Sequence, residues 1–281
     1  MLIGVFASAV VQEFLSGRLV MRLMPRRPLP AILLGSLGGL LVPVCDCGAI
    51  PLARRLIAKG VPVAAGLTFL LAAPVVNPIT LFATMLAFQG NVGVVVLRAL
   101  MTLSVAIGVG WLTSVLLSDA RLKLPGLLQS PSDPDKEAAT QLGIGKRLSS
   151  VLSRTSAEFF DVFFFIALGA LFTAVTQTFV PRTDLAAFGS RPVASVLALM
   201  PTASVLSICS EADAFVGRAL AGSFSPGSVL AFLTIGQIVD LRNSLLLWRT
   251  FGARLVGLMV VVGYSVVLLE GVALNAVLGT P

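Results

Sequence analysis

Long apolar runs with few interruptions dominate the pattern of this chain. Residues 92–117 form the longest run, which is broken only by Arg98, and another extends over residues 256–269. About 20 mostly apolar residues form a helix long enough to cross the hydrocarbon core of a bilayer. These runs lack the alternation of apolar and polar positions that transmembrane barrel strands require. The pattern therefore predicts an all-α polytopic membrane protein.

Shorter apolar segments are separated by prolines, glycines and single polar residues. In the first half they cover residues 4–20, 31–42, 50–58, 63–73 and 80–88. The third and fourth of these meet at Gly60-Val61-Pro62, and each is too short to span a bilayer. Irregular backbone at membrane depth must be buried in protein or line a cavity. We therefore expect a re-entrant helical hairpin between chain breaks at Cys45 and Asn77.

The second half of the chain repeats the first at an offset of 163 to 165 residues. At an offset of 164, Cys45 coincides with Cys209, and Pro62 with Pro226. We expect two internal repeats, inverted relative to each other, each with a broken helix and a re-entrant hairpin. Such repeats are typical of secondary transporters, whose substrate site lies at the repeat interface. The expected boundaries are a first transmembrane repeat over 1–118, a polar cytoplasmic linker over 119–155 and a second transmembrane repeat over 156–281.

Composition narrows the class of function. Only 12% of the residues are charged, about half the ~25% that is usual in a soluble domain. The net charge of +7 comes from basic residues at the ends of apolar segments, which is typical of cytoplasmic flanks and does not indicate a nucleic-acid partner. The chain has no histidine, which excludes a His-based zinc site, His-ligated haem and a histidine proton relay. We expect a multi-pass protein of the bacterial inner membrane that has no cofactor and is not an enzyme.

Polar side chains gather at the predicted breaks. A charge within the membrane is costly, which favours a functional role for the acids there. The alternative is structural pairing of these acids with Arg54, Arg218 or Arg242. The two asparagines are either ligand contacts or helix–helix hydrogen-bonding groups. The predicted substrate-binding set is Cys45, Asp46, Cys47, Pro74, Asn77, Cys209, Glu211, Asp213, Asp240 and Asn243.

All three cysteines of the chain lie at two matching breaks. Cys45 and Cys47 flank one residue, so an extended backbone would let both sulfurs face a common cavity with Cys209. Soft thiolate ligands select soft metals and metalloids, so these three residues form a predicted three-thiolate site. Helices that begin just after Cys47 and Glu211 would direct their positive N-terminal ends toward this site. The alternative is that each cysteine is a small buried apolar residue.

Three motifs carry a family resemblance that covers nearly the whole chain. They are Pro43-Val44-Cys45-Asp46-Cys47-Gly48-Ala49-Ile50-Pro51, Lys59-Gly60-Val61-Pro62 and Ala72-Ala73-Pro74-Val75-Val76-Asn77-Pro78-Ile79. At these motifs the chain resembles the predicted permease family that includes YraQ and the organoarsenical efflux permease ArsP. The segment 238–243 also resembles the family, with Gln237 where a proline is usual.

The resemblance implies an inner-membrane permease. The arsenic branch of the family exports trivalent organoarsenicals, with cysteines as the implied ligands. Carried over to this sequence, the resemblance implies Cys45, Cys47 and Cys209 as thiol contacts. It also implies Asn77 and Asp240 as polar residues of the breaks.

These observations predict a secondary efflux permease for a small soft or thiol-reactive solute, organoarsenical-like, with a central Cys/Asp/Asn site. No G-x-x-x-x-G-K-[ST] nucleotide motif occurs, so a proton or another ion is the expected energy source. The hypothesis for a proton routes it through Asp46, Glu211 or Asp240. The expected partners are the lipid bilayer and a small-molecule substrate, and assembly as a homo-oligomer stays open. Two alternatives compete with this reading: a membrane thiol–disulfide relay that uses Cys45 and Cys47, and a structural membrane subunit of a partner complex.

Overall fold

The computed structural model describes residues 28–41, 46–58, 60–116 and 192–278. These residues form helices joined by turns, and no strand occurs among them. The first half contributes α3 (Pro28–Leu41), α4 (Asp46–Ala58), α5 (Val63–Ala72), α6 (Pro78–Ala87) and α7 (Val92–Leu116). The second half contributes α12 (Pro192–Leu206), α13 (Ser210–Leu220), α14 (Pro226–Ile238), α15 (Leu241–Phe251) and α16 (Ala253–Leu278).

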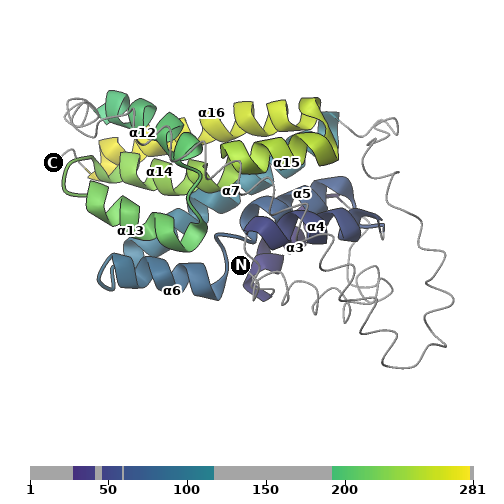
Figure 1. The fold of residues 1–281 in the computed structure, drawn as a ribbon, viewed down its shortest axis with the longest axis horizontal. Coiled ribbons are helices and arrows are strands. Elements are labelled where there is room, and N and C mark those ends of the chain that lie inside the picture. The colour runs from purple at the N-terminus through teal and green to yellow at the C-terminus, as the bar shows by residue number, and fades with distance from the viewer. Residues whose placement is uncertain (1–27, 42–45, 59, 117–191, 279–281) are drawn as a thin grey trace.

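Two long helices, α7 and α16, run along the bundle, and the shorter helices pack around them (Figure 1). Helix α5 packs against α3 and α7, and α14 packs against α12 and α16. Contacts between the halves come from α7 with α14 and α16, from α6 with α13, and from α4 with α15. The core is therefore shared by the two halves.

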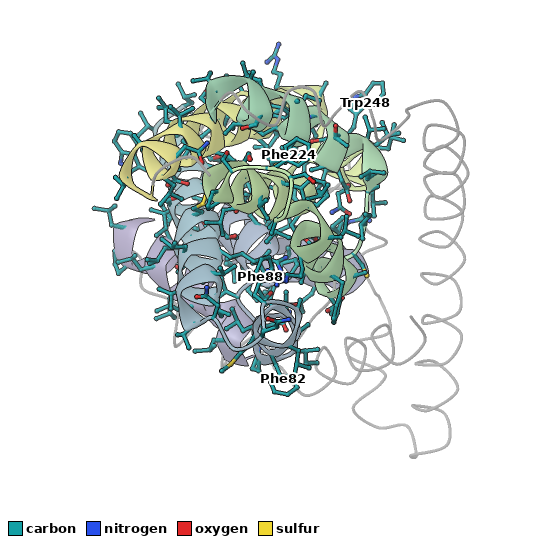
Figure 2. The ribbon with its side chains drawn as sticks, turned by 90° about the vertical axis from the view of Figure 1, so that its left-hand side faces the viewer. Phe82, Phe88, Phe224 and Trp248 are labelled. Carbon is teal, nitrogen blue, oxygen red and sulfur yellow. The ribbon has the colours of Figure 1, made fainter. Side chains whose placement is uncertain are left out.

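Three stretches are long and apolar enough to cross a membrane: Val92–Leu116, Ala253–Val277, and Pro226–Trp248, which takes in α14 and most of α15 across the break between them. The outer surface is also apolar. Phe82 and Trp248 project from the bundle with 62% and 59% of their surface exposed, whereas Phe88 and Phe224 lie inside it (Figure 2). Large apolar side chains exposed in such numbers suit contact with lipid. The predicted all-α membrane class is confirmed.

Helix boundaries follow local signals in the sequence. Helices α6 and α14 begin at Pro78 and Pro226, where the missing N–H is not needed and the fixed φ suits the first turn. Helix α15 ends at Gly252, which has φ 87° and donates its N–H to the carbonyl of Trp248 at 3.0 Å. Glycine takes such a positive φ without steric cost, so it suits the residue that ends a helix.

Two helices begin earlier than the sequence predicts. Helix α4 begins at Asp46 and α13 at Ser210, so the backbone of Asp46, Cys47 and Glu211 is already helical. The prediction of helices starting just after Cys47 and Glu211 is therefore wrong, as is the prediction of extended backbone at Cys47. In α13, Glu211 and Asp213 lie in the first turn, where acidic side chains interact favourably with the N-terminal end of the helix dipole, which explains the earlier start of this helix.

Helix α3 lies unusually close to α5, and glycine makes this approach possible. A Cβ atom at Gly35 would lie 2.5 Å from the carbonyl oxygen of Ala65, which is closer than real atoms approach. The glycines of this segment therefore allow close helix packing, as small residues do between membrane helices.

Candidate functional site

A small pocket lies where both halves of the chain interrupt their helices. Its walls come from α4, from the end of α5 and the break after it, and from the end of α14 and α15. The volume of about 10 Å³ leaves room for roughly one water molecule. Its lining is apolar apart from two carboxamides, and the lining residues are Ile50, Leu70, Leu71, Pro74, Gln237, Ile238, Asn243 and Leu247.

The first break is held together by Asn77, which is the N-cap of α6. Its side-chain oxygen accepts a hydrogen bond from the N–H of Thr80 at 2.9 Å. Its Nδ2 donates to the carbonyls of Pro74 at 2.9 Å and Ala73 at 3.3 Å. The side chain thus satisfies polar backbone groups on both sides of the break. These groups would be costly to leave unpaired in a buried place.

The second break has the same construction, with an acid in place of the amide. Asp240 is the N-cap of α15, and its Oδ1 accepts from the N–H of Asn243. Asp240 is buried, with 1% of its surface exposed, and Asn243 is buried beside it. The two break residues at matching positions, Asn77 and Asp240, therefore cap the helices that follow them.

Replacing Asn77 by alanine should lower the free energy of unfolding by about 1–3 kcal/mol, because the cap is lost and buried carbonyls lose their donors. The neutral variant Asn77→Ser keeps an oxygen that can accept from the N–H of Thr80 but loses the amide that donates to both carbonyls, so it should lie between wild type and Asn77→Ala. The free energy of unfolding of both variants is measured by SDS titration in mixed micelles. Equal stability of Asn77→Ala and wild type would contradict the capping role.

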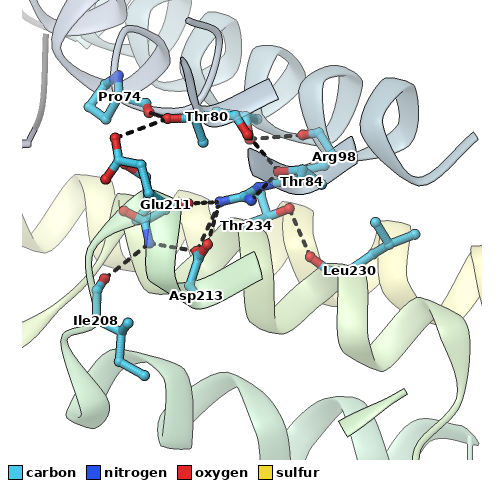
Figure 3. A network of polar contacts seen from close by, with 12 residues as sticks. Pro74, Thr80, Thr84, Arg98, Ile208, Glu211, Asp213, Leu230 and Thr234 are labelled. Atoms are coloured by element: carbon cyan, nitrogen blue, oxygen red, sulfur yellow. Dashed lines mark hydrogen bonds and ion pairs between the residues drawn. The ribbon is translucent and has the colours of Figure 1, made fainter. Parts of the chain in front are cut away.

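A buried ion pair lies beside the pocket and joins the two halves. Arg98 of α7 is fully buried, and its Nη2 lies 2.8 Å from Oδ1 and 2.9 Å from Oδ2 of Asp213 in α13 (Figure 3). Arg98 also donates from Nη1 to the hydroxyl of Thr84 at 2.7 Å and from Nη2 to the carbonyl of Ser210 at 3.2 Å. A buried guanidinium of this kind requires a partner charge and further acceptors.

Both acids in the first turn of α13 connect to residues that line the pocket. Gln237 donates from Nε2 to Oδ2 of Asp213 at 2.6 Å and to the carbonyl of Ile208 at 3.2 Å. On the other wall, the hydroxyl of Thr80 bonds to the carbonyl of Pro74 at 2.9 Å and to Oε1 of Glu211 at 3.4 Å (Figure 3). The pocket and α13 thus share one network of polar contacts.

Comparison with known proteins identifies the family. The sequence matches ArsP_1, a family described as predicted permeases, over residues 1–276. The chain belongs to this family. It is 39% identical over 259 residues to the UPF0718 protein YcgR of Bacillus subtilis (strain 168), which covers 92% of this chain and 86% of that protein. No solved structure matches the chain.

A second relative carries a more specific name. The chain is 32% identical over 255 residues to a Streptococcus mutans protein named as a subunit of a two-component membrane permease complex. The match covers 91% of this chain and 83% of that protein. The family predicted from the sequence is confirmed, and the chain is a multi-pass membrane protein of a predicted permease family.

Six of the ten site residues predicted from the sequence fall into three groups in this permease family member. Pro74 and Asn243 line the pocket, while Asn77 and Asp240 cap the helices beside it. Glu211 and Asp213 lie on α13 and reach the pocket through other side chains. Asp213 pairs with Arg98, whereas the sequence pointed to Arg54, Arg218 or Arg242 as partners for the acids.

Of the three cysteine side chains, the structure describes only that of Cys209. Cys209 is the N-cap of α13, is exposed and does not line the pocket. Cys45 lies outside the described residues, as do the side chains of Asp46 and Cys47. No group of three His, Cys, Asp or Glu suited to a metal ion occurs in the part of the chain that the structure describes. The three-thiolate site therefore stays a prediction.

Two residues of this site were missed from the sequence. Arg98 interrupts the longest apolar run, and a lone charge in such a run is itself a signal of function. Gln237 stands where the family motif usually has a proline, and this departure is its only signal in the sequence. Its amide does what a proline cannot do, because it donates hydrogen bonds to Asp213 and Ile208.

Proposed function

We propose that this protein is a secondary permease that moves a small solute through the pocket at the junction of its two halves. The observation that carries the proposal is the pair Pro74 and Gln237. These residues stand at matching positions of the two halves, 163 residues apart, and both line the pocket. A central site built from matching breaks is the arrangement of secondary transporters with internal repeats.

We further propose that the halves are inverted repeats with re-entrant hairpins α4–α5 and α13–α14. The order of helices α3 to α7 parallels the order of α12 to α16, and the packing partners within each half correspond pair by pair. Each hairpin helix has 10 to 13 residues. At about 1.5 Å per residue this gives at most about 20 Å, short of the roughly 30 Å hydrocarbon core. Short paired helices are therefore consistent with re-entrant segments.

The proposed cargo is a soft or thiol-reactive solute that leaves the cell. Support comes from the sequence positions of the three cysteines at matching breaks, because thiolates bind soft metalloids. Cys209 begins the helix that carries Asp213, and its thiol is exposed. Coupling to a proton through Asp46, Glu211 or Asp240 is part of the same proposal, and their amide variants test it by the dependence of transport on pH.

Everted membrane vesicles that contain the wild type should take up trivalent methylarsenical. Uptake into vesicles that contain the variant Cys45→Ser/Cys47→Ser/Cys209→Ser should not exceed uptake into vesicles without the protein. Loss of the thiolate ligands removes the groups that recognise the solute. Arsenite serves as a second probe, measured alongside. Gly257→Ala is the matched control, because a Cβ at that exposed position on α16 meets nothing within 4 Å.

Each outcome of the vesicle assay decides a separate part of the proposal. Uptake that persists in the triple serine variant would remove the thiol site while leaving the permease in place. Absence of uptake by the wild type for both probes would remove the arsenical cargo.

A second candidate function is supported by one observation, the name of the Streptococcus mutans relative. Because that protein is named as a subunit of a two-component membrane permease complex, we propose that this chain also assembles with a second membrane protein to form a permease. Purified protein reconstituted alone in proteoliposomes tests this directly. Transport by the single chain would show that no second component is required.

A further inference from the structure

The residues of the polar network around Asp213 are not repeated at the matching positions of the sequence. The position that matches Asp213 in the first half is Ala49, and the position that matches Gln237 is Pro74. Residues 259–262 of α16, which correspond to the region of Arg98 in α7, are all apolar. The Arg98–Asp213 pair thus has apolar residues at the matching positions of the sequence. The repeat alone does not require this pair.

Stability alone also gives a weak reason to keep the pair. A buried ion pair is often no more stabilising than apolar side chains of similar volume, because two charges lose their hydration. Two buried polar atoms next to it, Nε of Arg98 and Oγ of Ser210, have no hydrogen-bond partner among the described residues. Unsatisfied buried groups reduce the net stability of the closed arrangement further. Such a contact is well suited to being opened.

The orientation of the Gln237 amide follows from its neighbours. The carboxylate of Asp213 and the carbonyl of Ile208 can only accept hydrogen bonds, so the NH₂ group must face both. Nothing among the described residues donates to the remaining atom, the carbonyl Oε1, and Gln237 lines the pocket. Oε1 is therefore available to a hydrogen-bond donor that enters the pocket.

The charges that face Asp213 are few. From α7 it meets Arg98, and from its own helix Glu211 lies nearby. The other helices packed against α13 are α6 and α14, and neither contains an ionisable residue. The state of Asp213 therefore depends on Arg98, on the Gln237 amide and on Glu211.

We propose that Gln237 couples occupancy of the pocket to the Arg98–Asp213 ion pair, and that this pair latches α13 to α7 while the pocket is closed. Gln237 Oε1 accepts a hydrogen bond from an N–H or O–H group of the solute. The amide then shifts, its Nε2 leaves Asp213, and α13 separates from α7. The inference rests on the proposed permease function and adds a positioning residue and a solute property, a hydrogen-bond donor.

The latch can be tested without any solute by measuring distances between spin labels with double electron–electron resonance. The labels are attached to Leu100→Cys on α7 and Ala219→Cys on α13, both exposed positions, in full-length protein with its native cysteines replaced by serine. Wild type should give one narrow distance distribution. The variants Gln237→Leu and Asp213→Asn should add a second population at longer distance. The matched control is Thr234→Val, one turn earlier on α14, where the threonine hydroxyl bonds only to the carbonyl of Leu230. This variant should show no second population at longer distance.

The variant Gln237→Glu separates coupling from a merely structural role. At about pH 8 its carboxylate faces Asp213 and repels it, so the longer distance should appear; at about pH 5 one shared proton restores a donor and the single distance should return. Wild type and Thr234→Val should show no such change. This titration also keeps the test valid if Gln237→Leu does not fold.

Distances that match wild type in both Gln237 variants, at both pH values, would overturn the latch. Because no solute is present, that result leaves the proposed permease function standing. Conversely, absence of arsenical transport in vesicles leaves the latch standing if the label distances respond as described.

Discussion

Replacing Asp213 by leucine should lower the free energy of unfolding by about 3–5 kcal/mol, because the change leaves a buried charge without its partner. Arg98 is fully buried, and a guanidinium does not lose its proton in a protein. The hydroxyl of Thr84 and the carbonyl of Ser210 would remain as its only hydrogen-bond partners. Neither carries a charge that could compensate for the missing carboxylate.

Replacing Arg98 by methionine should cost less than replacing Asp213, although the same ion pair is lost. A carboxylate left alone in a buried place can take up a proton and become neutral, and the Gln237 amide still donates to it. The double variant Arg98→Met/Asp213→Leu should regain most of the stability, because apolar pairs commonly replace buried ion pairs without loss. The two single changes are therefore strongly non-additive.

Unfolding by SDS in mixed micelles, followed by the fluorescence of Trp111 and Trp248, gives the three free energies. Thr234→Val serves as a control for a polar change on a neighbouring buried helix that leaves the pair intact. Two results would contradict the argument: equal costs for the two single variants, or a double variant that is as unstable as Asp213→Leu.

Much of the helical pattern could be predicted because it depends on local signals. The segments 63–73 and 92–117 differ by one residue from α5 and α7, since proline, glycine and the end of an apolar run set their limits. The starts of α4 and α13 could not be predicted in the same way. There, acidic residues that suggested a polar break instead belong to the first helical turn.

The candidate site could be predicted only as far as its residues belong to the breaks. Pro74 and Asn243 were expected at the site and do line the pocket. The partner of Asp213 could not be predicted, because Arg98 lies 115 residues away in sequence and on another helix. Local pattern favoured the arginines of the hairpins, whereas the contact depends on how α7 crosses α13. Such pairings become visible only in three dimensions.

A second large loss of stability is expected at Gly227, where α14 and α16 approach each other closely. A Cβ atom at Gly227 would overlap the carbonyl oxygen of Gly271 and would lie 2.6 Å from Oδ1 and 2.9 Å from Cγ of Asn275. The N–H of Gly227 also donates to Oδ1 of Asn275 at 2.8 Å. The variant Gly227→Val therefore has to push two helices apart and break a buried hydrogen bond. We expect a loss of about 3 kcal/mol or more, or no folded protein.

The smaller change Gly227→Ala separates the two obstacles. Combined with Asn275→Ala it removes the side chain that the new Cβ would meet, but the carbonyl oxygen of Gly271 is backbone and stays in place. The double variant should therefore recover only part of the stability lost by Gly227→Ala, again measured by SDS unfolding. Gly257→Ala, also on α16 but open to its surroundings, should be near neutral. Because α14 carries Gln237 at its far end, helices forced apart at Gly227 should also give the longer α7–α13 label distance. An unchanged label distance in a folded Gly227→Ala protein would mean that α14 does not transmit movement to the ion pair.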